Sequence, residues 1–405
     1  MKSLRVFVVG AGLGGLAAAS CLRRSGFDVT VFEQAAALGE VGAGVQIGPN
    51  AVRVLHQIGI KDGFEKVAVR PISLDVRDWE TARIINTITL GDTYEARYGL
   101  PYYHVHRADL HTLLADAFEA VAPGCIRLNA KCIGLEQLNS EVRLTFDDGT
   151  SAVGDVVIGA DGIHSSVREA LFGPDNPHFT GMVAFRGTVP LNRLPPGLIE
   201  CKGYNWSGPH HHFVHYLLKG GSLVNCVGVC DQDDWRVESW SVEGDMDEFR
   251  NEFTGWHDTI QALIGGMDSC FKWALYDREP LAQWSRDHTT LLGDACHPML
   301  PFLAQGACMA IEDGYVLAHC LRTHDSAAAG LKAYETIRLP RVSRVQLGAR
   351  ERGKTLHMSD PKAMAKRNAQ NAADPAMRAR EMDWIYDHDV AAEYGVLNEP
   401  QPASR

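Results

Sequence analysis

Three glycines near the start of the chain have the spacing of a nucleotide-binding turn. Gly10, Gly12 and Gly15 form a GxGxxG pattern between a strand-like apolar stretch and a helix-like one. Glu33 closes the next strand-like stretch about twenty residues later. In such a turn the glycines permit a tight bend, close approach of a pyrophosphate, and close packing of helix on strand. The helix start would hold the phosphates and Glu33 would accept hydrogen bonds from a ribose.

The fingerprint leaves the identity of the nucleotide open, because an acid at this position suits both NAD and the adenosine half of FAD. The uncharged run from Val6 to Leu22, preceded by Lys2 and Arg5, also fits a secretory signal peptide. Glycines interrupt this run, and it is shorter than the ~20 apolar residues of a membrane-spanning helix. Cleavage near Ser20 would destroy the strand, helix and strand of the fingerprint. We therefore favour a nucleotide cradle.

The composition excludes several classes of partner. The chain has 405 residues, 45% of them hydrophobic, and a formal net charge of -11. With no long basic run, it offers no electrostatic patch for nucleic acid or an anionic membrane, so we expect neither as a partner. Its ten cysteines are scattered and form no CxxC pair, which argues against a zinc site or a disulfide framework. Reduced thiols indicate a cytoplasmic protein.

Apolar patterning predicts an α/β protein with two separate groups of strands. Strands near the cradle alternate with helices, which is typical of a Rossmann-like sheet. A second group, from about Met182 to Val229, lies far from the cradle in the sequence and is expected to form a second sheet. Other expected elements are a glycine-rich loop and helix in 39–59, a helix in 246–265, a strand, loop and long helix in 289–321, and a polar helical tail from 348 to 386.

Two further motifs follow the fingerprint in order. GADGIHSSVR spans 159–168 and LLGDACHPMLPFLAQGACMAIED spans 291–313. Together with GAGLGG they resemble the single-component FAD-dependent aromatic hydroxylases over nearly the whole chain. The resemblance implies a Rossmann-like FAD-binding domain, an inserted mixed β-sheet substrate domain and a C-terminal helical region. We expect the FAD-binding domain in 1–70, 104–175 and 285–345, the substrate domain in 71–103 and 176–284, and the C-terminal segment in 346–405.

The same resemblance assigns cofactor contacts. A strand delivers Asp294 to a loop, where the matching family aspartate accepts hydrogen bonds from the ribityl hydroxyls of FAD. Gly306 opens the next helix, whose positive end would face the flavin pyrimidine ring. Asp161 matches a second family acid, or is an ordinary N-cap, and Arg107 matches an arginine beside the phosphates, or is a surface arginine. The expected cofactor contacts are Gly10, Gly12, Gly15, Glu33, Gln46, Arg107, Asp161, Asp294, Gly306 and Ala307.

The histidine-rich segment GPHHHFVHYLLKGG is expected to face the substrate. On a strand, His212 and Tyr216 point to one face, whereas His211 and His215 point to the other. The hydroxybenzoate and hydroxynicotinate enzymes show a similar histidine and tyrosine four residues apart. We therefore expect His212 to act as a base or hydrogen-bond partner, helped by Tyr216. A solvent-facing histidine run is one alternative. A metal site of His210, His212 and His215 is another, but the family binds no metal and we expect none.

Three further residues complete the expected substrate contacts. Pro301 lies in a turn that resembles the proline-rich turn under the flavin C4a oxygen. Phe302 departs from the resemblance, because 3-hydroxybenzoate 6-hydroxylases have glutamine in this loop, and the salicylate and hydroxynicotinate enzymes have histidine. Cys201 matches a cysteine of the hydroxynicotinate pocket. The departure at Phe302 leaves the identity of the substrate open.

The resemblance also implies an activity. NADH or NADPH would reduce the flavin, and a flavin C4a-hydroperoxide formed with molecular oxygen would hydroxylate an activated ring. The substrate would be a small aromatic hydroxy acid of the hydroxybenzoate or salicylate type. One alternative is decarboxylative hydroxylation of the 6-hydroxynicotinate type, and another, of a different class, is a non-catalytic flavin-binding regulatory protein. We expect a monomer or homodimer.

Overall fold

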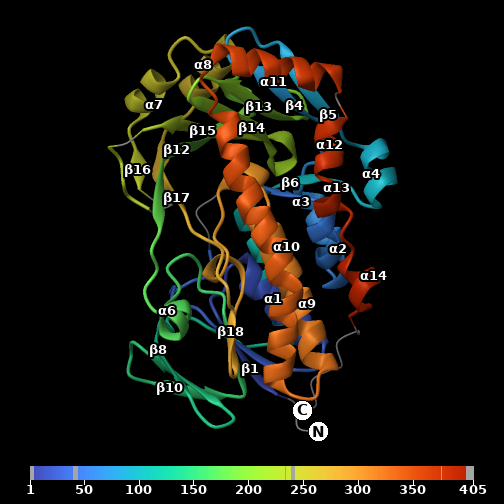
Figure 1. Ribbon diagram of the computed structural model, residues 1–405, viewed down its shortest axis with the longest axis vertical. Coiled ribbons are helices and arrows are strands. Elements are labelled where there is room, and N and C mark those ends of the chain that lie inside the picture. Colours follow the sequence, from blue (N-terminus) through green and yellow to red (C-terminus); the bar gives the residue numbers. More distant parts are fainter. Residues whose placement is uncertain (1–3, 40–43, 233, 239–241, 375, 398–405) are drawn as a thin grey trace.

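Two large sheets form the two ends of the molecule, and a 30-residue helix, α10 (Ala327–Leu356), runs between them (Figure 1). The computed structural model describes residues 4–39, 44–232, 234–238, 242–374 and 376–397. Part of the glycine-rich stretch expected after Gly39 lies outside these ranges. Within them, none of the helices is both long and apolar enough to cross a membrane. All ten cysteines are unpaired thiols.

One end is a six-stranded, mostly parallel sheet. Its strand β1 (Arg5–Val9) pairs in parallel with β2 (Asp28–Phe32) and β11 (Val156–Gly159). These strands are buried on both faces, which explains their continuous apolar sequences. The order is β18-β19-β11-β1-β2-β7, with outer strands β18 (Ser285–Arg286), β19 (Thr289–Leu291) and β7 (Ile126–Arg127). The expected Rossmann-like sheet is confirmed.

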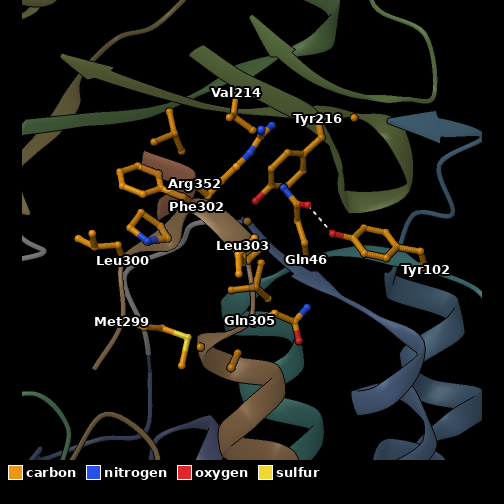
Figure 2. A pocket seen from close by; sticks show the side chains of 18 of the residues that line it. Gln46, Tyr102, Val214, Tyr216, Met299, Leu300, Phe302, Leu303, Gln305 and Arg352 are labelled. Atoms are coloured by element: carbon orange, nitrogen blue, oxygen red, sulfur yellow. Dashed lines mark hydrogen bonds between the residues drawn. The ribbon is translucent and has the colours of Figure 1, made fainter. Parts of the chain in front are cut away.

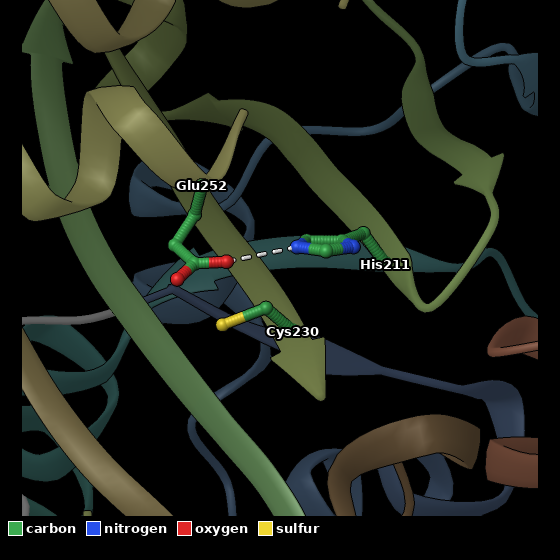
Figure 3. Close-up of side chains that lie close together, drawn as sticks. All are labelled: His211, Cys230 and Glu252. Atoms are coloured by element: carbon green, nitrogen blue, oxygen red, sulfur yellow. Dashed lines mark hydrogen bonds and ion pairs between the residues drawn. The ribbon is translucent and has the colours of Figure 1, made fainter. Parts of the chain in front are cut away.

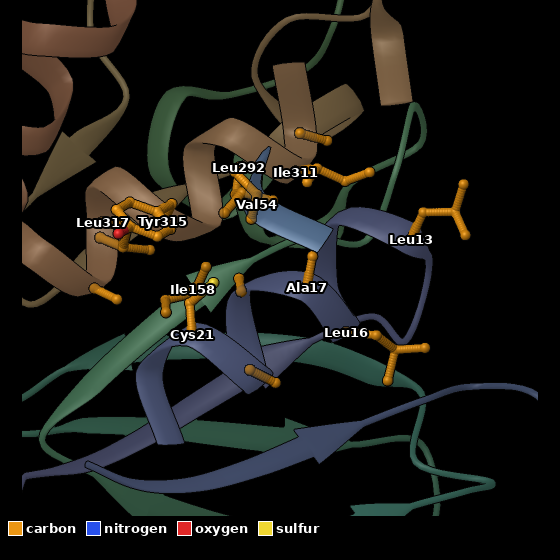
Figure 4. Packing of buried hydrophobic residues seen from close by; sticks show 14 of the residues in the cluster. Leu13, Leu16, Ala17, Cys21, Val54, Ile158, Leu292, Ile311, Tyr315 and Leu317 are labelled. Carbon is orange, nitrogen blue, oxygen red and sulfur yellow. The ribbon is translucent and has the colours of Figure 1, made fainter. Parts of the chain in front are cut away.

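Helices α1 (Leu13–Arg24) and α9 (Gly306–Thr323) pack closely beside this sheet. Figure 4 shows Ala17 and Cys21 on the side of α1 that lies toward α9. The approach depends on a small residue, because a Cβ added at Gly314 would lie 2.7 Å from the Cα of Ala18. The start of α9 is thereby placed beside the cradle.

The other end is an eight-stranded mixed sheet, as expected for the second group of strands. Its order is β16-β17-β12-β15-β14-β13-β4-β5. Strand β4 (Ser73–Asp78) pairs in parallel with β13 (Gly203–Gly208), so a segment far upstream joins this sheet. The other strands are β5 (Ile84–Thr89), β12 (His178–Pro190), β14 (His211–Leu218), β15 (Leu223–Asp231), β16 (Glu243–Gly244) and β17 (Cys270–Asp277).

The single helix expected in 246–265 is two helices, so that prediction is wrong. Helix α7 (Met246–Glu252) ends before Gly255, whose φ of +81° is incompatible with a continuing right-handed helix. Helix α8 (Asp258–Gly265) then begins with His257 as its N-cap. Both helices contribute apolar side chains to the core under the eight-stranded sheet.

The C-terminal part is helical, as expected. Helix α10 continues across positions 345 and 346, between which the sequence analysis placed the start of the C-terminal segment. The later helices are α11 (Pro361–Ala373), α12 (Met377–Glu381), α13 (Asp383–Tyr386) and α14 (Val390–Tyr394). The remaining elements are β3 (Gly44–Ile47), α2 (Pro49–Gln57), α3 (Lys61–Val67), α4 (Asp92–Tyr98), β6 (Tyr103–His106), α5 (Arg107–Val121), β8 (Cys132–Gln137), β9 (Val142–Phe146), β10 (Ser151–Gly154), α6 (Ser166–Phe172) and the short 3₁₀ turns η1 (Leu191–Arg193), η2 (Lys219–Gly221), η3 (Gly293–Ala295) and η4 (Pro301–Leu303).

Candidate active site

The GxGxxG turn forms a cradle that side chains would fill. A Cβ added at Gly10, where φ is +105°, would lie 2.4 Å from the carbonyl oxygen of Ala160. A Cβ added at Gly15 would lie 2.0 Å from the carbonyl oxygen of Gly10. At Gly12, by contrast, an added Cβ meets no described atom within 4 Å. The turn is therefore tight on its inner side and open at Gly12, beside the first N–H groups of α1, which have no hydrogen-bond acceptor within the helix itself.

Glu33 braces this turn from the end of β2. Its carboxylate accepts hydrogen bonds from the backbone N–H of Ala11 at 2.8 Å and from that of Ala35 at 2.9 Å. Each carboxylate oxygen can accept more than one hydrogen bond, so Glu33 could still accept from a ribose hydroxyl.

Asp294 is an exposed acid between buried neighbours. Gly293 and Ala295 are buried in the short turn η3, while the Asp294 side chain lines a cavity. Arg107, at the start of α5, lines the same cavity. Burial lowers the pKa of Arg107, and the negative charge of Asp294 partly offsets that effect. The two side chains thus present opposite charges to one ligand site.

A buried ion network fixes the loop that carries Asp294. The carboxylate of Asp313 in α9 accepts from His297 Nε2 at 2.6 Å and from the Gly293 N–H at 3.3 Å. Arg338 of α10 donates to Asp313 at 2.7 Å and to Glu312 at 2.6 Å. The side chains of Arg338, Glu312 and Asp313 have no solvent exposure. Helices α9 and α10 therefore hold the η3 turn in place through paired charges.

The cavity has a volume of about 450 Å³ and runs from the cradle to the eight-stranded sheet. Figure 2 shows Tyr216 and Gln46 on one side and Leu300 and Phe302 on the other. Most of the expected contacts line it: Gly12, Gly15, Gln46, Arg107, Asp294, Gly306, Ala307, His212, Tyr216, Pro301 and Phe302. Four expected contacts do not line it: Gly10, Glu33, Asp161 and Cys201.

Asp161 and Cys201, like Glu33, contact other parts of the protein. Asp161 accepts hydrogen bonds from the Ser166 hydroxyl at 3.0 Å and from the Val167 N–H at 3.2 Å, so it braces the start of α6. Its cofactor role stays a prediction. The Cys201 sulfur lies 3.4 Å from the carbonyl oxygen of Arg70, outside the cavity lining, and its contact with a substrate stays a prediction.

Tyr216 is held rigidly in the cavity wall. Its ring centroid lies 4.3 Å from that of His104, and an added Cβ at Gly44 would lie 2.5 Å from the Tyr216 ring. Burial raises the pKa of Tyr216, and a hydrogen bond with Gln46 opposes this rise. Gln46 also accepts from the Tyr102 hydroxyl at 2.5 Å (Figure 2). Tyr216 therefore lines the cavity as a neutral hydroxyl whose position is fixed.

His212 lines the same cavity, and its side chain points to the same face of β14 as Tyr216, as predicted. Its Nδ1 atom lies 2.7 Å from Nε2 of His357, and its ring is edge-on to Phe302 with centroids 5.4 Å apart. Burial lowers the pKa of His212 well below its ordinary value, and the charges of His357 and Arg352 lower it further. His212 is therefore neutral.

The other strand face holds a separate cluster. The Nε2 atom of His211 lies 3.0 Å from a carboxylate oxygen of Glu252, and the sulfur of Cys230 lies beside them (Figure 3). Burial raises the pKa of the Cys230 thiol, which points to the Val183 carbonyl oxygen at 3.7 Å, so it is protonated. His215 accepts from Trp206 Nε1 at 2.9 Å. We assign no metal to these residues.

Arg352 is a cavity residue that the sequence did not reveal. It follows Glu351 near the end of α10, and its guanidinium extends toward the strand that carries Val214 (Figure 2). Burial, together with the charges of Arg378 and Arg367, lowers its pKa to about 9. A lone arginine in a polar helical tail gives no signal in the sequence. The adjacent glycine, Gly353, is a weak signal in the sequence, because a glycine inside a helix can mark close packing. Phe302 packs directly on it.

Comparisons of the sequence with known proteins identify the family of this chain. An FAD binding domain model matches residues 3–348. The chain is 39% identical over 388 residues to 3-amino-4-hydroxybenzoate 2-monooxygenase of Streptomyces platensis, covering 96% of each chain. It is 40% identical to 6-hydroxynicotinate 3-monooxygenase of Pseudomonas fluorescens, covering 85% of this chain and 90% of that one. The chain belongs to the FAD-dependent aromatic hydroxylases.

A solved structure supports the same assignment. Klebsiella pneumoniae HpxO complexed with FAD and uric acid matches with a TM-score of 0.85 at 26% identity, over 95% of this chain and 96% of that chain. As in other FAD-dependent aromatic hydroxylases, the cofactor here is FAD, and the residues fit it. The open position at Gly12 suits a pyrophosphate, and the exposed Asp294 suits a ribityl chain.

Replacing Asp294 by alanine is expected to weaken FAD binding by about 10- to 100-fold, because hydrogen bonds from hydroxyls to a carboxylate are lost. Fluorescence titration of the apoprotein with FAD measures this affinity. Asp325, exposed in the loop before α10, provides a matched control, since its replacement by alanine should leave FAD binding unchanged. An unaltered affinity in Asp294→Ala would show that this loop does not hold the cofactor.

Proposed function

We propose that this FAD-dependent aromatic hydroxylase acts on a small aromatic hydroxy acid of the hydroxybenzoate type, with NADH or NADPH as the electron donor. When bound, the flavin supplies activated oxygen at its C4a position. The protein's own side chains must then hold the ring, favour its electron-rich phenolate form and exclude water.

The observation that carries this proposal is the charge on Arg352. Burial and the charges of two arginines from the later C-terminal helices, Arg378 and Arg367, act on Arg352, and the charge of Glu381 opposes them in part. Arg378 pairs with Glu381 at 3.1 Å, and Arg367 donates to Ser207 and to the Thr355 carbonyl. For Arg352, the described residues provide neither an ion pair nor a hydrogen bond. A desolvated cation in a mainly apolar cavity is suited to a substrate carboxylate.

The arrangement also supports a role for His212. Its lowered pKa is caused in part by the charge of Arg352, so the two side chains lie near one another in the cavity. A ring whose carboxylate binds Arg352 could place a hydroxyl near the neutral imidazole of His212. Tyr216, on the same strand face, would orient that hydroxyl. A single small ring could therefore satisfy the cation, the base and the tyrosine together.

A substrate screen tests the proposal. The purified, FAD-loaded protein is mixed with hydroxybenzoates, aminohydroxybenzoates, salicylate and 6-hydroxynicotinate, and NAD(P)H oxidation is followed with product analysis by mass spectrometry. We expect at least one acid to accelerate NAD(P)H oxidation and to gain an oxygen atom. Loss of carbon dioxide in the product would instead identify the decarboxylative reaction. If no acid stimulates oxidation, the non-catalytic flavin-binding alternative is favoured.

Replacing Arg352 by methionine is expected to raise KM for the acid about 10- to 100-fold, because the carboxylate loses a charge-assisted partner. The matching phenol without a carboxyl group should show little change, and steady-state kinetics compares the two. Arg344→Met is the control. Arg344 is on the same helix but does not line the cavity, and its guanidinium carbon lies 3.7 Å from the ring centroid of Trp384. Equal losses for acid and phenol in Arg352→Met would refute carboxylate recognition.

A further inference from the structure

A chain of hydrogen-bonding side chains leads from the cavity to the protein surface. His212 Nδ1 lies 2.7 Å from His357 Nε2, and His357 Nδ1 lies 2.5 Å from a carboxylate oxygen of Asp231. The three residues come from β14, the end of β15 and the residue after α10. The side chain of His357 is 6% exposed and that of Asp231 is 38% exposed. The chain therefore connects a buried imidazole to a solvent-accessible carboxylate.

The direction of these hydrogen bonds follows from the carboxylate. An ionised carboxylate only accepts, so His357 must donate through its Nδ1–H to Asp231. His357 Nε2 is then an acceptor and takes the Nδ1–H of His212. This leaves the Nε2 lone pair of His212 as the one available to a ligand in the cavity. Asp231 thereby sets the tautomer of both imidazoles.

We propose that His357 and Asp231 form a proton relay that orients His212 and carries the proton of the substrate hydroxyl from the cavity to water. The inference rests on the proposed function and extends it with two positioning residues. Neither residue lines the cavity. Both would act through His212.

The relay resolves a difficulty with His212 as a base. Burial and the neighbouring charges of Arg352 and His211 disfavour a positive charge on this imidazole. A proton that moves on to His357 rests instead beside Asp231. Although burial alone would raise the pKa of Asp231, hydrogen bonds from His357 and His210 keep it below its ordinary value, so the carboxylate is ionised. The positive charge is then stabilised by an adjacent negative one.

The proton transfer balances without another reactant. The O–H bond of the substrate breaks, its proton binds His212 Nε2, and the substrate becomes a phenolate. The Nδ1 proton of His212 passes to His357 Nε2, so His212 is again neutral. His357 becomes an imidazolium paired with Asp231, and the proton leaves to water through that exposed carboxylate.

The tautomers can be tested without any substrate. Nitrogen NMR of ¹⁵N-histidine-labelled holoenzyme should show that His212 is protonated at Nδ1 and unprotonated at Nε2. Asp231→Asn removes the acceptor-only group and should shift the nitrogen signals of both His357 and His212. A His212 protonated at Nε2 in the wild-type holoenzyme would overturn the relay.

Proton transfer can be tested with 4-hydroxy-3-nitrobenzoate, whose phenolate absorbs visible light. The probe is titrated with pH when bound to wild-type holoenzyme and to the variants Asp231→Asn and His357→Gln. Both substitutions should raise the apparent pKa of the bound phenol by about one unit or more, because the proton that leaves the phenol can no longer rest on a His357 imidazolium paired with Asp231. The phenolate should therefore appear only at higher pH in these variants.

The control is His210→Asn. His210 Nδ1 lies 2.9 Å from the other carboxylate oxygen of Asp231 but is not part of the proton relay. Asparagine tolerates the φ of +61° at this position. This variant should keep the wild-type pKa of the bound phenol. The relay is wrong if Asp231→Asn and His357→Gln bind the probe with an unchanged pKa. If the wild-type protein hydroxylates no aromatic acid, the proposed function fails, while the tautomer measurement still decides the relay.

Discussion

Replacing His212 by asparagine is expected to slow ring hydroxylation by about 100-fold or more, which is the usual effect of losing a positioned base. Asparagine can keep a donor in place of His212 Nδ1, which lies 2.7 Å from His357 Nε2, so the substitution isolates the loss of the Nε2 acceptor. FAD content and the rate of flavin reduction should be preserved. Reduced flavin that cannot hydroxylate the ring should consume oxygen to form hydrogen peroxide. Stopped-flow kinetics with product quantification separates these steps.

The matched control lies one residue away on the same strand. His211 points to the opposite face and pairs with Glu252, so His211→Asn should keep both the rate and the coupling of hydroxylation to NAD(P)H oxidation. A His212→Asn variant with wild-type coupling would exclude His212 as the base.

Replacing Arg338 by methionine is expected to lower the free energy of unfolding by about 3–5 kcal/mol. Arg338 is fully buried and pairs with both Glu312 and Asp313. Its removal leaves two buried carboxylates with fewer compensating charges, and desolvation makes such a loss expensive. Denaturant unfolding monitored by circular dichroism measures the difference.

An exposed pair on the same helix serves as the control. Lys354 and Glu351 are both about two-thirds exposed, at 67% and 66% of their side chains. Lys354→Ala should change the free energy of unfolding by less than about 1 kcal/mol, because solvent screens exposed pairs. Similar losses in both variants would show that burial does not decide the strength of the Arg338 network.

Local sequence determined the cofactor half of the site. Gly10 through Glu33 form one strand, turn, helix and strand, in which Gly10 and Gly15 are required by close contacts with Ala160 and within the turn, while Gly12 leaves the turn open. Asp294 and Gly306 likewise follow from a single loop and the helix after it. Short segments with specific backbone requirements restrict the residue types that can occupy them, so spacing alone was informative. Strand alternation also placed His212 and Tyr216 on one face.

Tertiary structure decided the rest of the substrate half. His357 and Asp231 lie 145 and 19 positions from His212, and Arg352 comes from a helix whose sequence shows no functional pattern. Their meeting depends on the register of β14 against β15 and on how α10 docks across both sheets. The packing of these elements likewise places Cys201, on the segment before β13, outside the cavity lining. A sequence records local backbone preferences, but contacts between distant side chains arise only when whole elements pack together.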